Sequence, residues 1–405
     1  RRAAPLLRGL RRGMATASPT SRPVYLVGQG MTPVIRKNPR TLREMGAEAI
    51  RDAVSEARID PKDVGGLYVG NMLAGMLSCQ QHIGPLLSQA AGLTGMPESV
   101  TAEACCGAGG AALRLGYTAV ASGMHTTVVV AGVEAMVHAD KGDVTKGLAA
   151  ASDWEHEGSR GETFVTLNGH LMDLYLKAYP HVDREDFGAF SANAHSNAQT
   201  NMLATFQAGK PADPARYAES PVVMDSPIRV LDASPTCDGA AAVVLTSDPS
   251  VAAASGAGGL VRVAGSGAAT DLLCVSDRAE PLALAAARAS TERALAGAGM
   301  GLNNVDVFEL HDAYTIMACL SLEASGFCLP GEGARIAKEG AIGLQGYVPI
   351  ATFGGLKARG HPVGATGVYQ AAEMLLQLTD RGGANQVRGA QVAMAQNVGG
   401  AGSSV

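Results

Sequence analysis

The sequence predicts an α/β protein of layered sheets and helices, built from two similar halves. Residues 127–131 and 241–245 are apolar runs without alternation, which is typical of strands covered on both faces. Residues 41–57 carry apolar side chains at helical spacing. Residues 282–310 then repeat the order of elements in the first part of the chain, which favours an internal duplication.

The first half opens with a strand and an amphipathic helix. The strand is expected at 24–27, where an apolar run ends at Gly28 and Gly30. The helix at 41–57 places its apolar residues on one face: Leu42, Met45, Ala49, Ile50, Ala53, Val54 and Ala57. A second strand is expected at 64–69.

The second half repeats this plan. A helix at 282–296 leads through a Gly/Asn turn to a strand at 305–310, as the helix at 41–57 leads to the strand at 64–69. We therefore expect these segments to occupy equivalent places in the two halves.

Two turns give a second and stronger correspondence. The turn at Cys106 opens an Ala/Leu helix that precedes the strand at 127–131. The turn at His361 opens a helix at 369–378 that precedes a strand at 392–395. This correspondence predicts that Cys106 and His361 take equivalent positions.

The expected domain boundaries follow from composition. A first half at 23–250 and a second half at 260–405 are separated by a Pro/Ala/Gly/Ser-rich span at 248–259. Residues from about 138 to 225 hold the only tryptophan and many charges, and we interpret them as a helical or loop insertion. Residues 1–22 form a separate leading segment.

That leading segment predicts a mitochondrial address. It is rich in arginine, and the first acidic residue of the chain is Glu44. The alternatives are an extension without a targeting role, with the protein in the peroxisome or the cytoplasm. The arginines are Arg1, Arg2, Arg8, Arg11, Arg12 and Arg22.

Composition excludes several classes of protein. With 47% hydrophobic and 17% charged residues, the chain is neither disordered nor fibrous. A net charge of -5 gives no reason to expect nucleic acid as a partner, and no apolar run approaches the ~20 residues of a membrane span. Small molecules are the expected ligands.

The cysteines and histidines do not form a metal or disulfide pattern. The 7 cysteines are an odd number without C-x-x-C spacing, and the 9 histidines include no H-E-x-x-H pair. We expect no metal site. Whether one cysteine is a nucleophile is the remaining question.

Cys106 is the first candidate for chemistry. A thiol before Gly107 at the start of a helix is expected to have a lowered pKa, because backbone N–H groups and the helix dipole stabilise the thiolate. The alternative is a small buried side chain that only caps the helix.

Three further residues are candidates for the same site. His361 lies in a Gly-rich loop and can serve as a base; a hydrogen-bonded structural histidine is the alternative. His311 leaves a buried strand at its C-terminal end, where α/β sheets place their sites, although it could be a core histidine with Asp312 as a helix cap. Gly399 follows the last strand and can offer its N–H to an oxyanion.

These segments make residues 23–405 resemble the thiolase family. The resemblance rests on EACCGAG at 103–109, AGVEAM at 131–136, CDGAAAVV at 237–244, HDAY at 311–314 and GHPVGATG at 360–367. The HD pair and the Asn-Val-Gly run make the sequence similar to sterol-carrier-protein-type and archaeal acetoacetyl-CoA thiolases. The resemblance implies a five-layered αβαβα sandwich of two repeated halves with an inserted loop domain.

The resemblance also implies roles for the candidate residues. Cys106 would accept the acyl group, His361 would activate it, and His361 and His311 would donate to the thioester oxygen. The N–H groups of Cys106 and Gly399 would form a second oxyanion hole. Coenzyme A and acyl-CoA would be substrates, with no permanently bound cofactor.

One departure from the family pattern concerns the second catalytic cysteine. Asn397 and Ala313 occupy the places where other thiolases carry that thiol. Cys319, on the following helix, is a candidate replacement if it points inward. Otherwise His311 or a water would move the α-carbon proton.

The function implied is a thiolase-type acyltransferase of lipid and fatty-acid metabolism that makes or cleaves 3-oxoacyl-CoA, with acetoacetyl-CoA as the expected substrate. The alternatives are another condensing enzyme of the superfamily and a non-catalytic acyl-CoA-binding or scaffold subunit. A homodimer or homotetramer is expected, because thiolases pair through the strand next to the nucleophile turn and the apolar run at 126–130 is poorly suited to an exposed edge.

Overall fold

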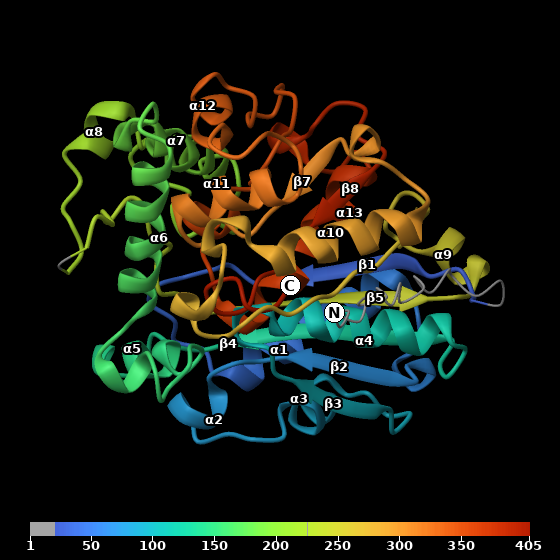
Figure 1. Cartoon of the computed structure of the whole chain (residues 1–405). Helices are drawn as coiled ribbons and strands as arrows, with labels where there is room; N and C mark the ends of the chain where they lie inside the picture. The colour runs from blue at the N-terminus through green and yellow to red at the C-terminus, as the bar shows by residue number, and fades with distance from the viewer. Residues whose placement is uncertain (1–20, 225) are drawn as a thin grey trace, which may run out of the picture.

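Helices and sheets alternate in five layers in the computed structural model, which describes residues 21–224 and 226–405 (Figure 1). The expected leading segment at 1–22 lies almost entirely outside the described residues. One helical layer holds α1 (Leu42–Ala57) and α3 (Ile83–Ala91), and a central one holds α4 (Ala108–Ala121) and α13 (Thr366–Leu378). This confirms the expected layered α/β fold.

The first sheet separates these two helical layers. Its order is β3-β2-β4-β5-β1-β6, with parallel pairing of β2 to β3 and β4, and antiparallel pairing from β4 through β5 and β1 to β6. The strands are β1 (Tyr25–Met31), β2 (Gly66–Gly70), β3 (Glu98–Ala102), β4 (Thr127–Glu134), β5 (Gly239–Thr246) and β6 (Val261–Arg262).

The position of β4 corrects one expectation. All but the first residue of the apolar run at 126–130 belongs to β4, which lies between β2 and β5 and is buried throughout. Its apolar character is therefore explained by helices on both faces and strands on both sides, not by an edge in contact with a partner. The edge strand next to the Cys106 turn is β3.

Strand β1 continues through the glycines that were expected to end it. A Cβ on Gly30 would lie 2.2 Å from the carbonyl oxygen of Ala49, and one on Gly28 would lie 2.5 Å from that of Ala53. These glycines let the backbone of α1 pack directly on the sheet. Thr41 starts α1 with a capping box, as its side chain accepts from the N–H of Glu44.

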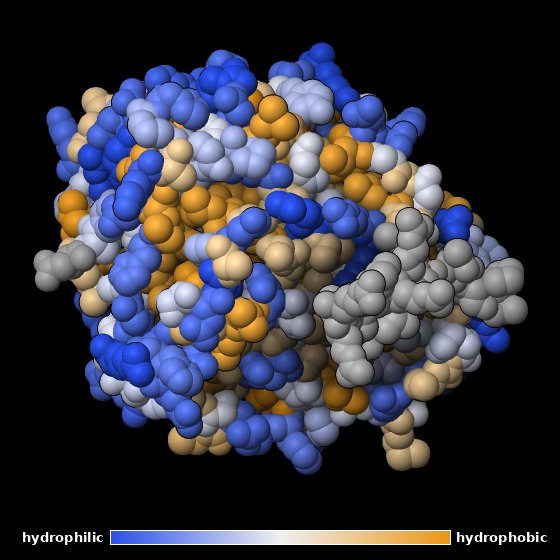
Figure 2. Space-filling model, in the orientation of Figure 1, coloured by the Kyte–Doolittle hydropathy of each residue, from blue (hydrophilic) through white to orange (hydrophobic). Residues whose placement is uncertain are grey.

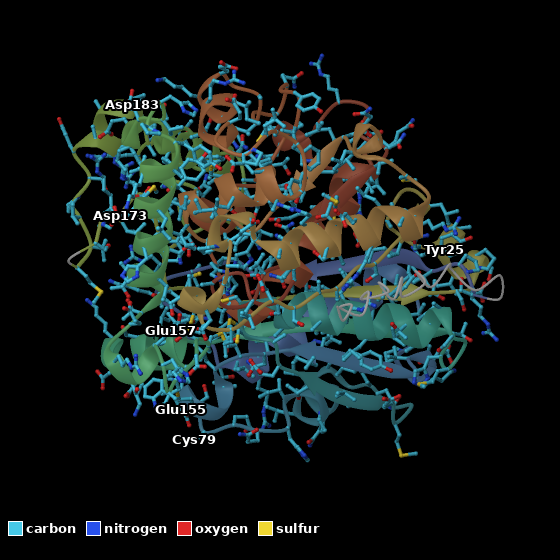
Figure 3. The ribbon with its side chains drawn as sticks, viewed as in Figure 1. Tyr25, Cys79, Glu155, Glu157, Asp173 and Asp183 are labelled. Carbon is cyan, nitrogen blue, oxygen red and sulfur yellow. The ribbon has the colours of Figure 1, made fainter. Side chains whose placement is uncertain are left out.

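The insertion is helical and lies against the second half. Its helices are α5 (Lys141–Ala149), α6 (Phe164–Ala178), α7 (Gly188–Ala198) and α8 (Pro214–Ala218). Figure 3 shows Asp173 and Asp183 on its outer side. Buried Asp232 connects the insertion to the second half, because it pairs with Arg184 and accepts from Tyr217 Oη at 2.5 Å and Thr315 Oγ1 at 2.5 Å.

The second half repeats the expected order in a smaller sheet. The elements are α10 (Ala285–Ala298), β7 (Val307–Glu309), α11 (Thr315–Ala324), α12 (Gly333–Lys338), α13 and β8 (Ala393–Ala395). Strand β7 pairs with β8 in parallel. The order α10–β7 corresponds to α1–β2, and α13–β8 corresponds to α4–β4.

The two halves meet where α4 and α13 begin. A Cβ on Gly109 would lie 2.9 Å from the N of Gly367, and one on Gly367 would lie 2.4 Å from the N of Gly110. Backbone therefore contacts backbone at this point, which brings the turn of Cys106 next to the loop of His361. No helix within 21–224 and 226–405 is long and apolar enough to cross a membrane.

Candidate active site

Cys106 lies in a short 3₁₀ turn, Cys105–Gly107, between β3 and α4. The residue before it, Cys105, has a left-handed φ of 54°, and its N–H donates to Glu103 Oε1 at 2.6 Å. A left-handed conformation is costly for a residue with a side chain, and such strain is found most often at functional sites. The turn leaves the Cys106 side chain only 5% exposed.

The structure brings three of the predicted residues together. The Cys106 sulfur and one ring nitrogen each of His311 and His361 lie within 4.8 Å of one another. The two imidazole rings are 5.0 Å apart between centroids and cross at 89°. A thiol from the first half thus faces two imidazoles from the second half.

His361 is held by a hydroxyl that the sequence analysis did not single out. Its Nδ1 lies 2.7 Å from Thr366 Oγ1, at the start of α13, while its Nε2 is buried and has no partner. Burial lowers the pKa of His361 well below its usual value, so the ring is neutral. His361 precedes the 3₁₀ turn Val363–Ala365, whereas Cys106 lies inside its own turn, so the two positions are close but not equivalent.

His311 is oriented by hydrogen bonds to its Nδ1. The N–H of Val398 donates to this atom at 3.2 Å, and Asn397 Nδ2 lies 3.3 Å from it. Because an accepting Nδ1 carries no proton, the ring proton sits on Nε2. Burial lowers the pKa of His311 to about 3, so it is a neutral donor. This geometry favours the predicted oxyanion role over the alternative role as a proton shuttle.

The resting Cys106 is a thiol. Burial raises its pKa, and the nearby Cys105 and Glu134 add to the rise, while the backbone N–H of Cys106 itself opposes it. The expectation of a lowered pKa at the helix start is therefore wrong for this structure, because desolvation of the thiolate outweighs the dipole. Cys106 and His361 form a neutral pair.

Gly399 lies beside the nucleophile turn. A Cβ on Gly107 would be 3.2 Å from the N of Gly399. The N–H of Gly399 donates to the carbonyl oxygen of Ser404 at 2.8 Å, so in this structure it is occupied by the chain itself. Its role in a second oxyanion hole stays a prediction.

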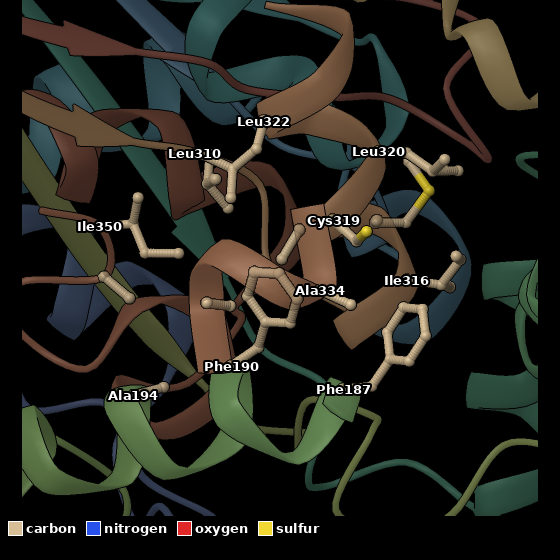
Figure 4. Close-up of a cluster of buried hydrophobic side chains, with 14 of the residues drawn as sticks. Phe187, Phe190, Ala194, Leu310, Ile316, Cys319, Leu320, Leu322, Ala334 and Ile350 are labelled. Carbon is tan, nitrogen blue, oxygen red and sulfur yellow. The ribbon is translucent and has the colours of Figure 1, made fainter. Parts of the chain in front are cut away.

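Cys319 does not join the site. Its Sγ donates to Glu323 Oε1 at 3.5 Å, on the side of α11 that faces Tyr175. Figure 4 shows it among buried side chains such as Phe187 and Ile316. The condition under which Cys319 would replace the second thiol, a side chain turned toward Cys106, is not met. Exposed Cys79 lies near α2 (Ala74–Leu77) at the surface (Figure 3).

Cys106, His311 and His361 are also the residues closest to a metal-ligand set within the described part of the chain. The hydrogen bond from Val398 argues against that use, since it engages the free lone pair of His311 and leaves Nε2 protonated. The donor set therefore fits acid-base chemistry better than metal binding.

Glu134 binds backbone N–H groups of both halves next to the site. Its carboxylate accepts from the N–H groups of Met72 at 2.9 Å and Leu73 at 3.0 Å, and from Gly364 at 3.2 Å in the loop after His361. Burial raises the pKa of Glu134 to about 7. The AGVEAM run contains this residue, but only the fold reveals that it joins the two halves.

An apolar hollow on the surface lies away from this site. A cavity of about 620 Å³ is lined by α6, the segment before α10 and the end of α11. Figure 2 shows apolar side chains gathered on this face. Its lining includes Leu174, Tyr179 and Leu282, and none of Cys106, His311 or His361.

A thiol beside one imidazole whose Nε2 has no partner, and beside a second imidazole whose Nε2 carries a proton, defines a class of site. In this class, cysteine forms a covalent bond with the substrate and histidine takes its proton. The two similar halves that supply these groups point to one family.

Comparisons with known proteins agree. Residues 24–210 match the family described as "Thiolase, N-terminal domain" and residues 267–405 match "Thiolase C-terminal domain-like". The chain is 38% identical to an acetyl-CoA acetyltransferase of Methanothermobacter thermautotrophicus over 364 residues, which is 90% of this chain and 93% of that protein. It is 29% identical to sterol carrier protein 2 of Rattus norvegicus over 412 residues, 97% of this chain and 72% of that protein.

A solved structure described as "Ltp2-ChsH2(DUF35) aldolase" has the same fold. Its TM-score is 0.81 at 20% identity, and the match covers 95% of this chain and 97% of that one. The chain belongs to the thiolase family. It is a thiolase-type acyltransferase, and the resemblance seen in the sequence is confirmed.

Proposed function

We propose that this protein makes or cleaves 3-oxoacyl-CoA through an acyl group carried on Cys106. The observation that supports the proposal is the convergence of the Cys106 sulfur with the His311 and His361 ring nitrogens within 4.8 Å. The role of each histidine in the reaction is assigned from the hydrogen bonds of its ring.

In the first step, His361 Nε2 takes the proton of Cys106, and the thiolate attacks the thioester carbonyl. The bond from sulfur to acyl carbon forms, and the bond from that carbon to the CoA sulfur breaks. CoA leaves as a thiol with the proton from His361. His311 Nε2–H donates to the thioester oxygen as negative charge develops there.

In the second step, the same imidazole is available again. His361 is neutral after CoA has left, so its Nε2 can take the α-proton of a second acyl-CoA. The resulting carbanion attacks the acyl carbon on Cys106, and the cysteine sulfur regains the proton. This assignment requires no second thiol, which suits a chain with Asn397 and Ala313 at the usual positions.

We propose acetyl-CoA and acetoacetyl-CoA as the substrates. Two relatives of at least 35% identity are named acetyl-CoA acetyltransferase, and each match covers at least 90% of this chain. Transfer of longer acyl groups is the alternative. A role in lipid and fatty-acid metabolism follows from this chemistry, and the arginine-rich start favours the mitochondrion.

The test is mass spectrometry of the intact protein after incubation with acetyl-CoA. We expect a gain of one acetyl group on Cys106, and none in Cys106→Ala. Cys319→Ser is the matched control, since it changes a buried thiol outside the site, and it should acetylate like the wild type. A protein that binds acetyl-CoA without acetylation would instead be the non-catalytic subunit.

A further inference from the structure

Asn397 touches both halves of the site. Its Oδ1 accepts from the N–H of Gly110 at 2.9 Å, and its Nδ2 donates to the carbonyl oxygen of Cys106 at 3.1 Å. The same Nδ2 lies 3.3 Å from His311 Nδ1. One side chain thus connects the nucleophile turn to the histidine that faces it.

These partners fix the orientation of the amide. A backbone N–H can only donate and a backbone carbonyl can only accept, so Oδ1 must face Gly110 and Nδ2 must face Cys106. The backbone of two glycines lies close to this side chain, because a Cβ on Gly367 would lie 2.4 Å from Oδ1 and one on Gly110 would lie 3.0 Å from the Asn397 Cβ.

The fixed amide acts together with the N–H of Val398 on the protonation of His311. Nδ2 of Asn397 and the N–H of Val398 both present hydrogens to His311 Nδ1. An Nδ1 that faces two donors can only accept, so the proton is held on Nε2. His311 is 3% exposed, so its ring lies almost entirely out of contact with solvent.

We propose that Asn397 is a positioning residue that holds His311 as the Nε2–H tautomer and keeps it in register with the Cys106 turn. It replaces a second thiol with a structural amide, so the site has one nucleophile and a prealigned donor. The kinetic part of this inference rests on the proposed function, and the tautomer does not.

The experiment measures the His311 tautomer and the kinetics in the same proteins. Long-range ¹H–¹⁵N NMR of the full chain, labelled on histidine, is assigned with His311→Gln. In the wild type at neutral pH we expect a proton on Nε2 and none on Nδ1. In Asn397→Asp, an oxygen replaces the donor, and the share of the Nε2–H form should fall.

Steady-state kinetics with acetoacetyl-CoA and CoA should show a 10- to 100-fold lower kcat for Asn397→Asp and for Asn397→Ala, with KM changed by less than about threefold. Asn201→Asp is the matched control. Asn201 also accepts a backbone N–H, from Leu203 at 2.9 Å, and donates to a backbone carbonyl, of Phe353 at 2.9 Å, but it lies outside the site. It should leave kcat and the tautomer unchanged.

A wild-type His311 with its proton on Nδ1 would overturn the proposal without any variant. So would a kcat within threefold of wild type in both Asn397 variants. Absence of acetyl-Cys106 in the wild type would instead contradict the proposed function, and the tautomer measurement would still decide the role of Asn397.

Discussion

At the scale of single residues, the sequence singles out three side chains that the structure brings together, but it does not show how they are held. Cys106, His311 and His361 stand out in Gly-rich or strand-end contexts, and the structure places them together. The tautomer of His311 depends on the N–H of Val398, which donates to its Nδ1, and the orientation of His361 depends on the Thr366 hydroxyl next to its Nδ1. Neither partner can be recognised from the residue types and spacing in the sequence. Burial, which sets the pKa of Cys106, is likewise a property of the folded chain.

Thr366 should be required for the orientation of His361. Thr366→Val keeps the shape of the side chain but removes the hydroxyl that lies 2.7 Å from Nδ1, so the ring is free to rotate. We expect kcat to fall about 10- to 100-fold, which corresponds to ~1.4–2.7 kcal/mol in the barrier, with KM nearly unchanged. Thr366→Ser retains the hydroxyl and should stay near the wild-type rate; equal losses in both variants would contradict this role.

At the scale of elements, periodicity predicts where helices and strands lie, and glycine contacts explain the differences. The helix expected at 41–57 is observed as α1 (Leu42–Ala57), and the strand expected at 24–27 extends to Met31. The extension could not be foreseen, because glycine usually marks a break, and only the packing of α1 shows why it continues a strand here. The central place of β4 depends on strand pairing, which hydropathy does not encode.

Gly30 should be intolerant of even a methyl group. In Gly30→Ala the new Cβ would meet the Ala49 carbonyl oxygen at 2.2 Å, and α1 would have to move off the sheet. We expect the free energy of unfolding to fall by about 1–3 kcal/mol in urea titrations. Gly142→Ala is the control, since nothing lies within 4 Å of its Cβ position in α5, and it should be neutral or gain about 0.5–1 kcal/mol. Equal stability of the two variants would contradict this prediction, because it would mean that α1 can move away from the sheet at little cost in free energy.

His195 should make α7 sensitive to acid. Burial, with a smaller effect of the charges of Lys357 and Arg216, lowers the pKa of His195 to about 3, and its Nε2 has no partner. Below pH ~6.5 the unfolded chain takes up a proton that the folded chain refuses, so stability falls as the pH is lowered toward 3, by up to ~1.4 kcal/mol per pH unit.

His195→Leu removes this proton-binding group from a 3%-exposed position beside Phe206. The difference in unfolding free energy, variant minus wild type, should therefore increase by about 1.4 kcal/mol for each unit by which the pH is lowered from about 5.5 to about 4.5. Urea titrations at these pH values measure it. Parallel stability curves for the two proteins would mean that His195 is charged in the folded state.

At the scale of the whole molecule, the repeated order of elements predicted two similar halves, and the resemblance to thiolases implied the five-layered sandwich. The outer edges of the sheets were not predictable in this way. Strand β3 is the edge strand that leads into the Cys106 turn, and of its residues only Ala102 is buried. An unpaired edge of this kind can add a strand from another copy.

We expect a homodimer paired through β3. Sedimentation at micromolar concentration should give twice the monomer mass, and Ser99→Lys, which places a charge on that edge, should weaken the dimer. Ser250→Lys is the control. Ser250 is an exposed serine in α9 (Pro249–Ala254), away from β3, and its substitution should leave the dimer intact. A monomer in the wild type, or equal effects of the two variants, would contradict pairing at β3.

The backbone contact between α4 and α13 makes the reactive centre an interface inside one chain. The first half carries the thiol, the second half carries both imidazoles and the amide, and no side chain separates Gly109 from Gly367 where they meet. A fragment that ends before the expected boundary at 248–259 would carry the thiol without either imidazole, and the complementary fragment would carry the imidazoles without the thiol. Each fragment alone should therefore be inactive, and activity should appear only when the two fragments are produced together. The activity then measures how well the two fragments assemble.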